Sequence, residues 1–156
     1  MKAEDGIIEL LNDCLSAELT AINQYFLDAK MCADWGYDRL AEKFREESID
    51  EMKDAEVLID RILYLDGLPN VQRLGTVKVG ETVPEKLRAA LDLEKAAIVR
   101  LNAGIDHCTK SGDNGTRELL KDILVGEEHH ADWLETQLET IAQIGDAHYL
   151  AQHVRA

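Results

Sequence analysis

Apolar residues recur at intervals of three and four positions along most of the chain, in four long segments and one short one. These segments cover roughly residues 5–34, 38–65, 84–111, 116–144 and 146–153. Such spacing places the apolar side chains on one face of an α-helix, and no strand pattern competes with it. Gly36 and Gly145 fall at two of the joins, and Pro84 falls where the first turn of a helix tolerates proline. The pattern predicts an all-α protein with four long helices and a short fifth.

The connection between the second and third segments, "DGLPNVQRLGTVKVGETV", is long for a compact domain and has no helical pattern. Fully extended, it could reach on the order of 55 Å. A helix of about 28 residues is only about 42 Å long, so this connection can run the whole length of a bundle. Two short joins and one long crossover are typical of the ferritin-like four-helix bundle, in which the second and third helices are parallel.

Length and composition add four expectations. The 156 residues fit one domain, residues 1–156, with a sizeable core. Neither a membrane span nor the layout of a signal peptide is present, so we expect a cytoplasmic protein. With 31 acidic and 17 basic residues the net charge is -14, which disfavours nucleic acid and anionic membranes as partners. Cys14, Cys32 and Cys108 lie far apart without a CxxC pair, which favours buried reduced thiols.

Each predicted helix carries a glutamate on its apolar face, close to its midpoint. These midpoint residues are Glu18, Glu51, Glu94 and Glu127, and on the second helix Glu47 and Asp54 lie on the same face. Because the midpoints of bundled helices lie at one level, we expect the four carboxylates to converge. Burying a carboxylate costs several kcal/mol, and four together also repel one another. The sequence therefore requires a compensating cation or shared protons, unless these faces are solvated or form a satisfied polar core.

Carboxylate oxygens combined with imidazole are ligands that suit iron or manganese. In di-iron carboxylate bundles, two helices each give one Glu and the other two each give a Glu-x-x-His motif. Glu127 and His130 form one such motif, whereas the second helix presents Glu51 and Asp54 at the same spacing. One such motif is common by chance, but four matching carboxylates predict a two-metal centre.

The stretches "ELTAINQYFL", "ESIDEMK", "ILYLDGLPN" and "DWLETQL", together with the residues above, resemble the bacterioferritin family over essentially the whole chain. The resemblance implies a cage of 24 identical or mixed subunits that stores a ferric mineral. It also implies that a di-iron ferroxidase centre in each bundle oxidises Fe(II) with dioxygen or peroxide. The resemblance further implies haem b between paired subunits and a ferredoxin-type reductase as a partner.

The same resemblance suggests a role for each candidate residue. Glu18 and Glu94 correspond to terminal iron ligands, Glu51 and Glu127 to bridging ligands, and His130 to the nitrogen ligand. Tyr25 resembles the redox-active tyrosine of the family, although a core tyrosine bonded to a carboxylate is an equal alternative. Met52 resembles the haem-binding methionine, since a two-fold axis could bring two copies to one haem iron. Its alternative is flexible packing at an interface.

Asp54 departs from the family pattern, which has histidine at this position. Four Glu and two neutral His would carry a charge of -4 and balance two ferrous ions, whereas Asp54 makes the set -5. We expect Asp54 still to bind metal. The alternative is a subunit with an impaired ferroxidase site, which co-assembles with a complete subunit and contributes mainly haem binding and cage structure.

Other functions receive less support from the sequence. A peroxidase of the rubrerythrin kind would need a CxxC segment, which is missing, and a purely structural bundle would leave the seam carboxylates unexplained. Glu46, Glu47 and Asp50 could guide iron inward, but we expect them to be solvated charges. His129 is expected at the surface.

Overall fold

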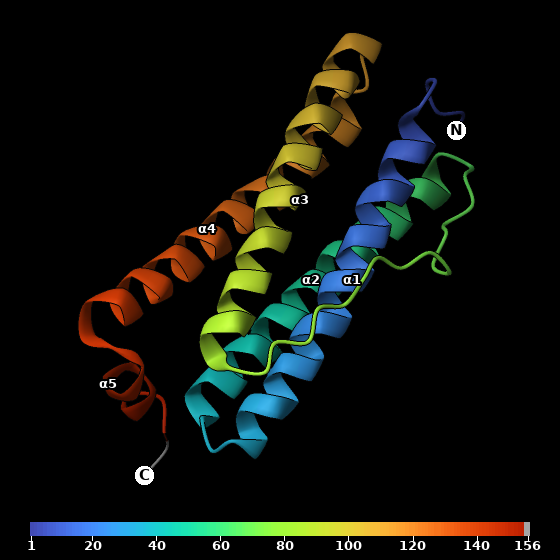
Figure 1. Cartoon of the computed structure of the whole chain (residues 1–156). Coiled ribbons are helices and arrows are strands. Elements are labelled where there is room, and N and C mark those ends of the chain that lie inside the picture. Colours follow the sequence, from blue (N-terminus) through green and yellow to red (C-terminus); the bar gives the residue numbers. More distant parts are fainter. Residues whose placement is uncertain (155–156) are drawn as a thin grey trace.

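The computed structural model describes residues 1–154 and confirms the predicted all-α bundle (Figure 1). Four long helices and a short fifth follow one another along the chain. Their bounds are α1 Ile7–Asp34, α2 Asp38–Tyr64, α3 Val83–Ser111, α4 Asn114–Ile144 and α5 Asp146–Ala151. Within residues 1–154 there is no strand, and no helix has an apolar stretch long enough to cross a bilayer.

Helix α4 begins two residues earlier than the sequence pattern predicts, because a side chain caps it. The Asp113 carboxylate accepts a hydrogen bond from the Thr116 backbone N–H at 2.9 Å, which satisfies a donor that the helix leaves free. The preceding helix ends at Ser111 and is capped by Gly112, whose φ of 74° is a left-handed conformation that glycine adopts without strain. The short join thus turns the chain back sharply, and α3 and α4 run antiparallel.

The long crossover runs back along the outside of α1 (Figure 1). Polar side chains spaced four residues apart on α1 hold its backbone by hydrogen bonds. These side chains are Asn12, Ser16, Thr20 and Gln24, whose partners are backbone groups of Leu68, Arg73, Gly75 and Lys78. The crossover therefore returns the chain to the starting end of α2, so that α2 and α3 are parallel, as the sequence predicts.

A buried ion pair joins the start of α3 to α1. The Lys86 ammonium lies 3.0 Å from Asp28 Oδ1, and both side chains are almost wholly buried. Burial raises the pKa of Asp28 to about 6, although Lys86 opposes this shift. The pair fixes the end of the crossover against the bundle, close to where α5 covers the core with the buried Tyr149.

The apolar core consists of two separate clusters. One contains Leu11, Leu58 and Leu101 among others, and the other contains Phe44, Leu87 and Leu134 among others. Between them, each of the four long helices contributes a buried glutamate. The bundle therefore has a polar layer across its middle, at the level that the sequence predicts. The three cysteines are buried and free, also as predicted.

Candidate metal centre

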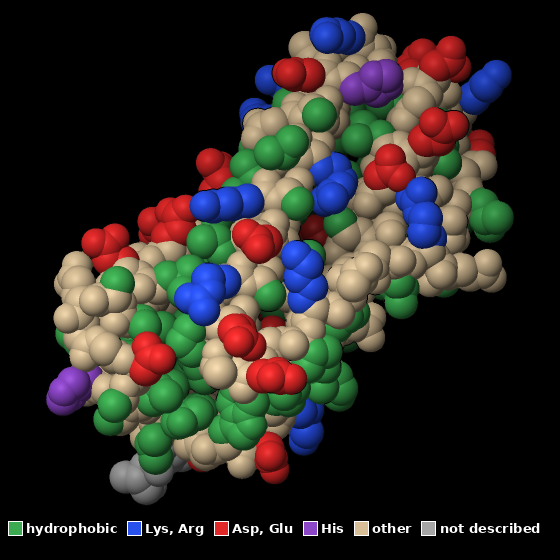
Figure 2. Space-filling view, viewed as in Figure 1, with side chains coloured by type: hydrophobic (Ala, Val, Ile, Leu, Met, Phe, Trp, Pro, Cys, Tyr) green, Lys and Arg blue, Asp and Glu red, His purple; other side chains and the backbone are tan. Residues whose placement is uncertain are grey.

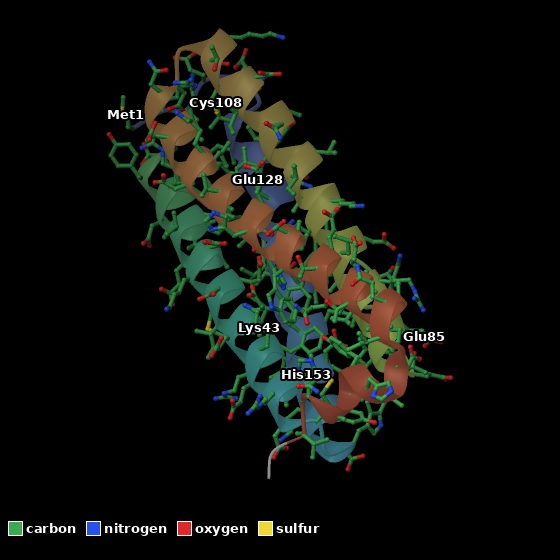
Figure 3. All side chains as sticks on the ribbon, turned by 90° about the vertical axis from the view of Figure 1, so that its left-hand side faces the viewer. Met1, Lys43, Glu85, Cys108, Glu128 and His153 are labelled. Carbon is green, nitrogen blue, oxygen red and sulfur yellow. The ribbon has the colours of Figure 1, made fainter. Side chains whose placement is uncertain are left out.

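The four seam glutamates converge in the polar layer. Their exposed fractions are 4% for Glu18, 4% for Glu51, 1% for Glu94 and 3% for Glu127. Each lies near the middle of its own helix, where the turns on either side carry apolar core residues. Neighbouring Glu128, labelled on α4 in Figure 3, is by contrast exposed. Helix periodicity thus separates a buried acid from a solvated one at adjacent positions.

Two overlapping groups of side chains have ligand atoms close enough to hold a metal ion. One group is Glu18, Glu51, Asp54 and Glu127, and the other is Glu47, Glu51 and His130. Within each group the ligand atoms all lie within 4.8 Å of one another. Glu51 belongs to both groups, and Glu94 Oε1 lies 2.9 Å from His130 Nδ1. The structure therefore brings together all six predicted metal ligands.

Asp54 lies at the edge of the first group and is half-buried. Burial raises its pKa to about 7, with smaller contributions from the negative charges of Asp50, Glu94 and Glu47. An aspartate at this position can thus present an oxygen to the same point as Glu18, Glu51 and Glu127. It also adds charge that a proton or a cation has to balance.

Glu18 and Glu51 of the first group are similarly unfavourable as free anions. Burial raises the pKa of Glu18 to about 8, and burial followed by the charge of Glu18 raises the pKa of Glu51 well above its usual value. Glu18 Oε2, Glu94 Oε2 and His130 Nε2 are buried without a hydrogen-bond partner. For the carboxylates, a divalent cation would remove both problems, since it offsets their charge and coordinates their free oxygen atoms. The donor set fits iron on chemical grounds, because carboxylates and imidazole both bind it.

Tyr25 is fully buried beside the His130 side of the cluster. Its hydroxyl donates a hydrogen bond to Glu94 Oε1, and its ring packs edge-on against the His130 ring with centroids 5.4 Å apart. Burial and the Glu94 charge raise the pKa of Tyr25 well above its usual value. The tyrosine bonded to a carboxylate that the sequence allowed is therefore present, and a redox role stays a prediction.

Glu47 is the residue that the sequence interpretation missed. The prediction that Glu47 is solvated is wrong, because only 7% of the residue is exposed. Glu46 and Asp50 are exposed, as predicted. Glu47 Oε1 pairs with the Lys43 ammonium at 2.8 Å, and Oε2 lies 3.3 Å from His130 Nδ1. One signal could have identified it: Glu47 precedes Glu51 by four positions and therefore shares its helix face.

Met52 points away from the carboxylates, onto the outer face of α1 and α2. It is 47% exposed, and Phe26 and Ile49 on the same face are 56% and 40% exposed. The three residues line one cavity of about 480 Å³. The structure thus places Met52 in an apolar surface hollow, apart from the metal ligands.

Two cavities reach the carboxylates from opposite sides of the bundle. The larger, about 640 Å³, lies between α1 and α3 and is lined by Glu18 and Glu94. Figure 2 shows this face, where basic and acidic side chains lie side by side. The smaller, about 360 Å³, lies between α2 and α4 and is lined by Glu47, Asp54 and His130. Small ions and molecules therefore have two approaches to the cluster.

The chain is similar in sequence to proteins of the ferritin family over most of its length. Residues 8–144 match the family described as Ferritin: Ferritin-like domain. The chain is 48% identical over 154 residues to a protein named bacterioferritin from Mycobacterium leprae, covering 99% of this chain and 97% of the relative. It is 50% identical over 151 residues to a bacterioferritin from Streptomyces coelicolor, covering 97% and 90%. It is also 45% identical over 149 residues to one from Brucella melitensis, covering 96% and 92%.

Proposed function

Because the chain belongs to the bacterioferritin family of iron-storage proteins, we propose that it oxidises Fe(II) to Fe(III) at a di-iron centre within each subunit and stores the ferric product as a mineral. The observation that carries the proposal is the convergence of five ligand side chains in the middle of the bundle. These are Glu18, Glu51, Glu94, Glu127 and His130. Ferrous iron is the substrate, and dioxygen or peroxide is the oxidant.

The residues divide into two sides that share Glu51 and Glu127, the predicted bridging pair. Glu18 and Asp54 would hold one iron, Glu94 and His130 would hold the other, and Glu51 and Glu127 would contribute to both. Bound iron would supply the redox chemistry. The protein supplies rigid ligands on helix backbones, and the apolar clusters on either side leave the two cavities as the approaches to the centre. The hydroxyl of Tyr25 holds one oxygen of Glu94 and so limits the orientations of that carboxylate.

A second candidate, the subunit with an impaired ferroxidase site, rests on Asp54 in place of histidine. The position of Asp54 favours the first candidate, because its carboxylate belongs to a compact group with Glu18, Glu51 and Glu127. An oxygen ligand at this point keeps the number of donors unchanged. The extra negative charge should stabilise Fe(III) relative to Fe(II) and thus make re-reduction of the centre harder.

Haem binding and assembly form the second part of the proposal. Met52 lies in an exposed apolar hollow with Phe26 and Ile49, which a second subunit related by a two-fold axis could cover. Haem b would then lie between the paired Met52 side chains. We propose a cage of 24 copies of this chain, alone or mixed with a second bacterioferritin subunit. In the cytoplasm, a ferredoxin-type reductase would deliver electrons for iron release.

Iron oxidation by the purified assembly tests the proposal directly. Protein freed of metal is titrated anaerobically with Fe(II) and then mixed with dioxygen, while absorbance reports the Fe(III) formed. We expect two tightly bound Fe(II) per chain and a fast first phase that saturates at that ratio. Protein that binds fewer than two, or that oxidises iron no faster than buffer, would contradict it.

The haem assignment has its own readout. Assembly purified from cells supplied with haem should show a Soret band, and Met52→Leu should abolish it. Leucine keeps the apolar volume but removes the thioether sulfur that would bind the iron. Ile49→Leu on the same face is the control and should keep the band.

A further inference from the structure

Glu47 is buried where the proposed function has no use for a carboxylate. It lies one turn before Glu51 on α2, and its side chain is 10% exposed. A buried carboxylate needs a partner to offset its charge. Glu47 has two: Oε1 forms the ion pair with Lys43, and Oε2 faces His130 Nδ1. One oxygen of Glu47 is therefore held by a cation of the protein, and the other points to a predicted metal ligand.

The donor atoms around His130, two of which form the hydrogen bond between His130 and Glu94, also have the spacing expected for ligands of one metal. Bonds from a metal to oxygen or nitrogen are about 2.0–2.2 Å, so two ligands at a right angle lie about 3 Å apart. His130 Nδ1 is 2.9 Å from Glu94 Oε1 and 3.3 Å from Glu47 Oε2. Ligand atoms of Glu47, Glu51 and His130 also lie within 4.8 Å of one another. An ion bound by Glu94 and His130 would thus find Glu47 within reach.

The surroundings of Glu47 distinguish it from the other acidic residues of α2. Lys43, labelled on α2 in Figure 3, lies with its ammonium 4.9 Å from the centroid of the Trp133 ring. Trp133 in turn stacks on His130, with ring centroids 6.2 Å apart. Lys43 is therefore held on the His130 side, where it offsets the charge that Glu47 brings to the cluster. Glu46 and Asp50 have no such position, since both are exposed.

We propose that Glu47 is a further metal ligand of the centre, with its Oε2 binding the ion that His130 holds. The inference rests on the proposed function, because it assumes that His130 binds metal. It adds one carboxylate to the histidine side, and Lys43 balances the added charge. The two sides of the centre then carry carboxylates in similar number, even though only one side contains an imidazole.

Zinc titration of the full-length assembly, stripped of metal, tests the inference in the variant Glu47→Gln. Glutamine keeps the shape and a carbonyl that can accept a hydrogen bond from His130, but it binds metal poorly. We expect one zinc equivalent per chain to weaken by at least about tenfold, the lower end for losing even an outer-shell partner. The other equivalent should be unchanged. Calorimetry with a competing chelator measures both affinities.

Glu46→Gln is the matched control, because it makes the same chemical change at the adjacent, exposed residue. It should leave both affinities within about twofold of the unsubstituted chain. Thermal unfolding of the stripped proteins checks that both variants fold. Equal affinities in Glu47→Gln and Glu46→Gln would overturn the inference and leave the proposed function standing. If the unsubstituted chain itself bound fewer than two zinc ions, the proposed function would fail instead.

Diffraction from zinc-soaked crystals gives an independent answer. Anomalous peaks locate the ions, and Glu47 Oε2 should lie about 2.0–2.2 Å from the ion at His130. A Glu47 carboxylate that stays on Lys43, with both oxygens more than about 3 Å from zinc, would contradict the assignment.

Discussion

The candidate centre has a histidine side, around His130, and an aspartate side, around Asp54. The two sides differ in how the protein offsets their buried negative charge. On the histidine side, Glu94 accepts a hydrogen bond from the Tyr25 hydroxyl and contacts His130, while Glu47 forms an ion pair with Lys43. On the aspartate side, Glu18, Glu51 and Asp54 meet mainly one another, and burial raises the pKa of each. Protein groups offset part of the charge on the first side, where Glu94 Oε2 and His130 Nε2 still lack a hydrogen-bond partner, whereas the second depends on protons or a cation. The aspartate side should therefore respond more strongly to metal and to pH.

The largest expected effect comes from removing Glu51, a ligand that both sides share. Glu51→Ala should weaken both metal equivalents by at least about a hundredfold, the upper end even for outer-shell losses. The fast phase of iron oxidation should disappear with them. Zinc titration and stopped-flow absorbance measure the two consequences. Glu56→Ala, an exposed change on the same helix, should alter neither, and two intact equivalents in Glu51→Ala would refute the shared role.

Replacing Asp54 should have a smaller effect, on the metal affinity of the aspartate side alone. Asp54→Ala removes a ligand from the aspartate side only, so one metal equivalent should weaken by about tenfold while the equivalent at His130 stays. Asp54→His should restore the lost affinity, because imidazole replaces the oxygen donor. Iron-soaked crystals of the unsubstituted chain show directly whether iron binds at Asp54. If anomalous scattering fills the His130 position and leaves the Asp54 position empty, Asp54 does not bind iron.

Oxidation rates of the same proteins test the alternative function. A subunit with an impaired site would oxidise iron slowly as isolated and gain a fast phase in Asp54→His. Our proposal expects a fast phase in both proteins.

The smallest expected effect is a dependence of stability on pH in protein stripped of metal. Burial raises the pKa of Asp54 to about 7 and of Glu18 to about 8, well above those of the unfolded chain. Between about pH 5 and pH 8 the folded form therefore holds more protons, and raising the pH favours unfolding. Melting temperature should fall by about 3 °C or more over this range, which corresponds to about 1 kcal/mol for a chain of this size.

Circular dichroism at fixed protein concentration measures this change. Excess zinc is the control, because bound cations displace the protons and should flatten the dependence. A melting temperature that rises from pH 5 to pH 8 in the stripped protein would show that the aspartate side is already compensated by the protein.

Much of the centre could be predicted because its residues follow the helical repeat. Glu18, Glu94 and Glu127 each interrupt an apolar face, and a charged residue on such a face is conspicuous in the sequence. The start of α4 was harder to predict from the sequence, since the Asp113 cap depends on the turn that precedes the helix. Glu47 lies four positions before Glu51 and so shares its helix face, but its contact with His130 depends on how α4 packs and could not be predicted from α2 alone.

The sequence by itself determined the four long helices, the parallel arrangement of α2 and α3, and the level at which the carboxylates meet. These features depend on periodicity and connection length, which are local properties of the chain. Only the tertiary structure decided which partners the acids of α2 meet. Successive residues on a helix differ by about 100° in direction, so Glu46 and Glu47 face different surroundings. Whether Glu47 meets solvent or a partner depends on His130 from α4, which packing brings to within 3.3 Å.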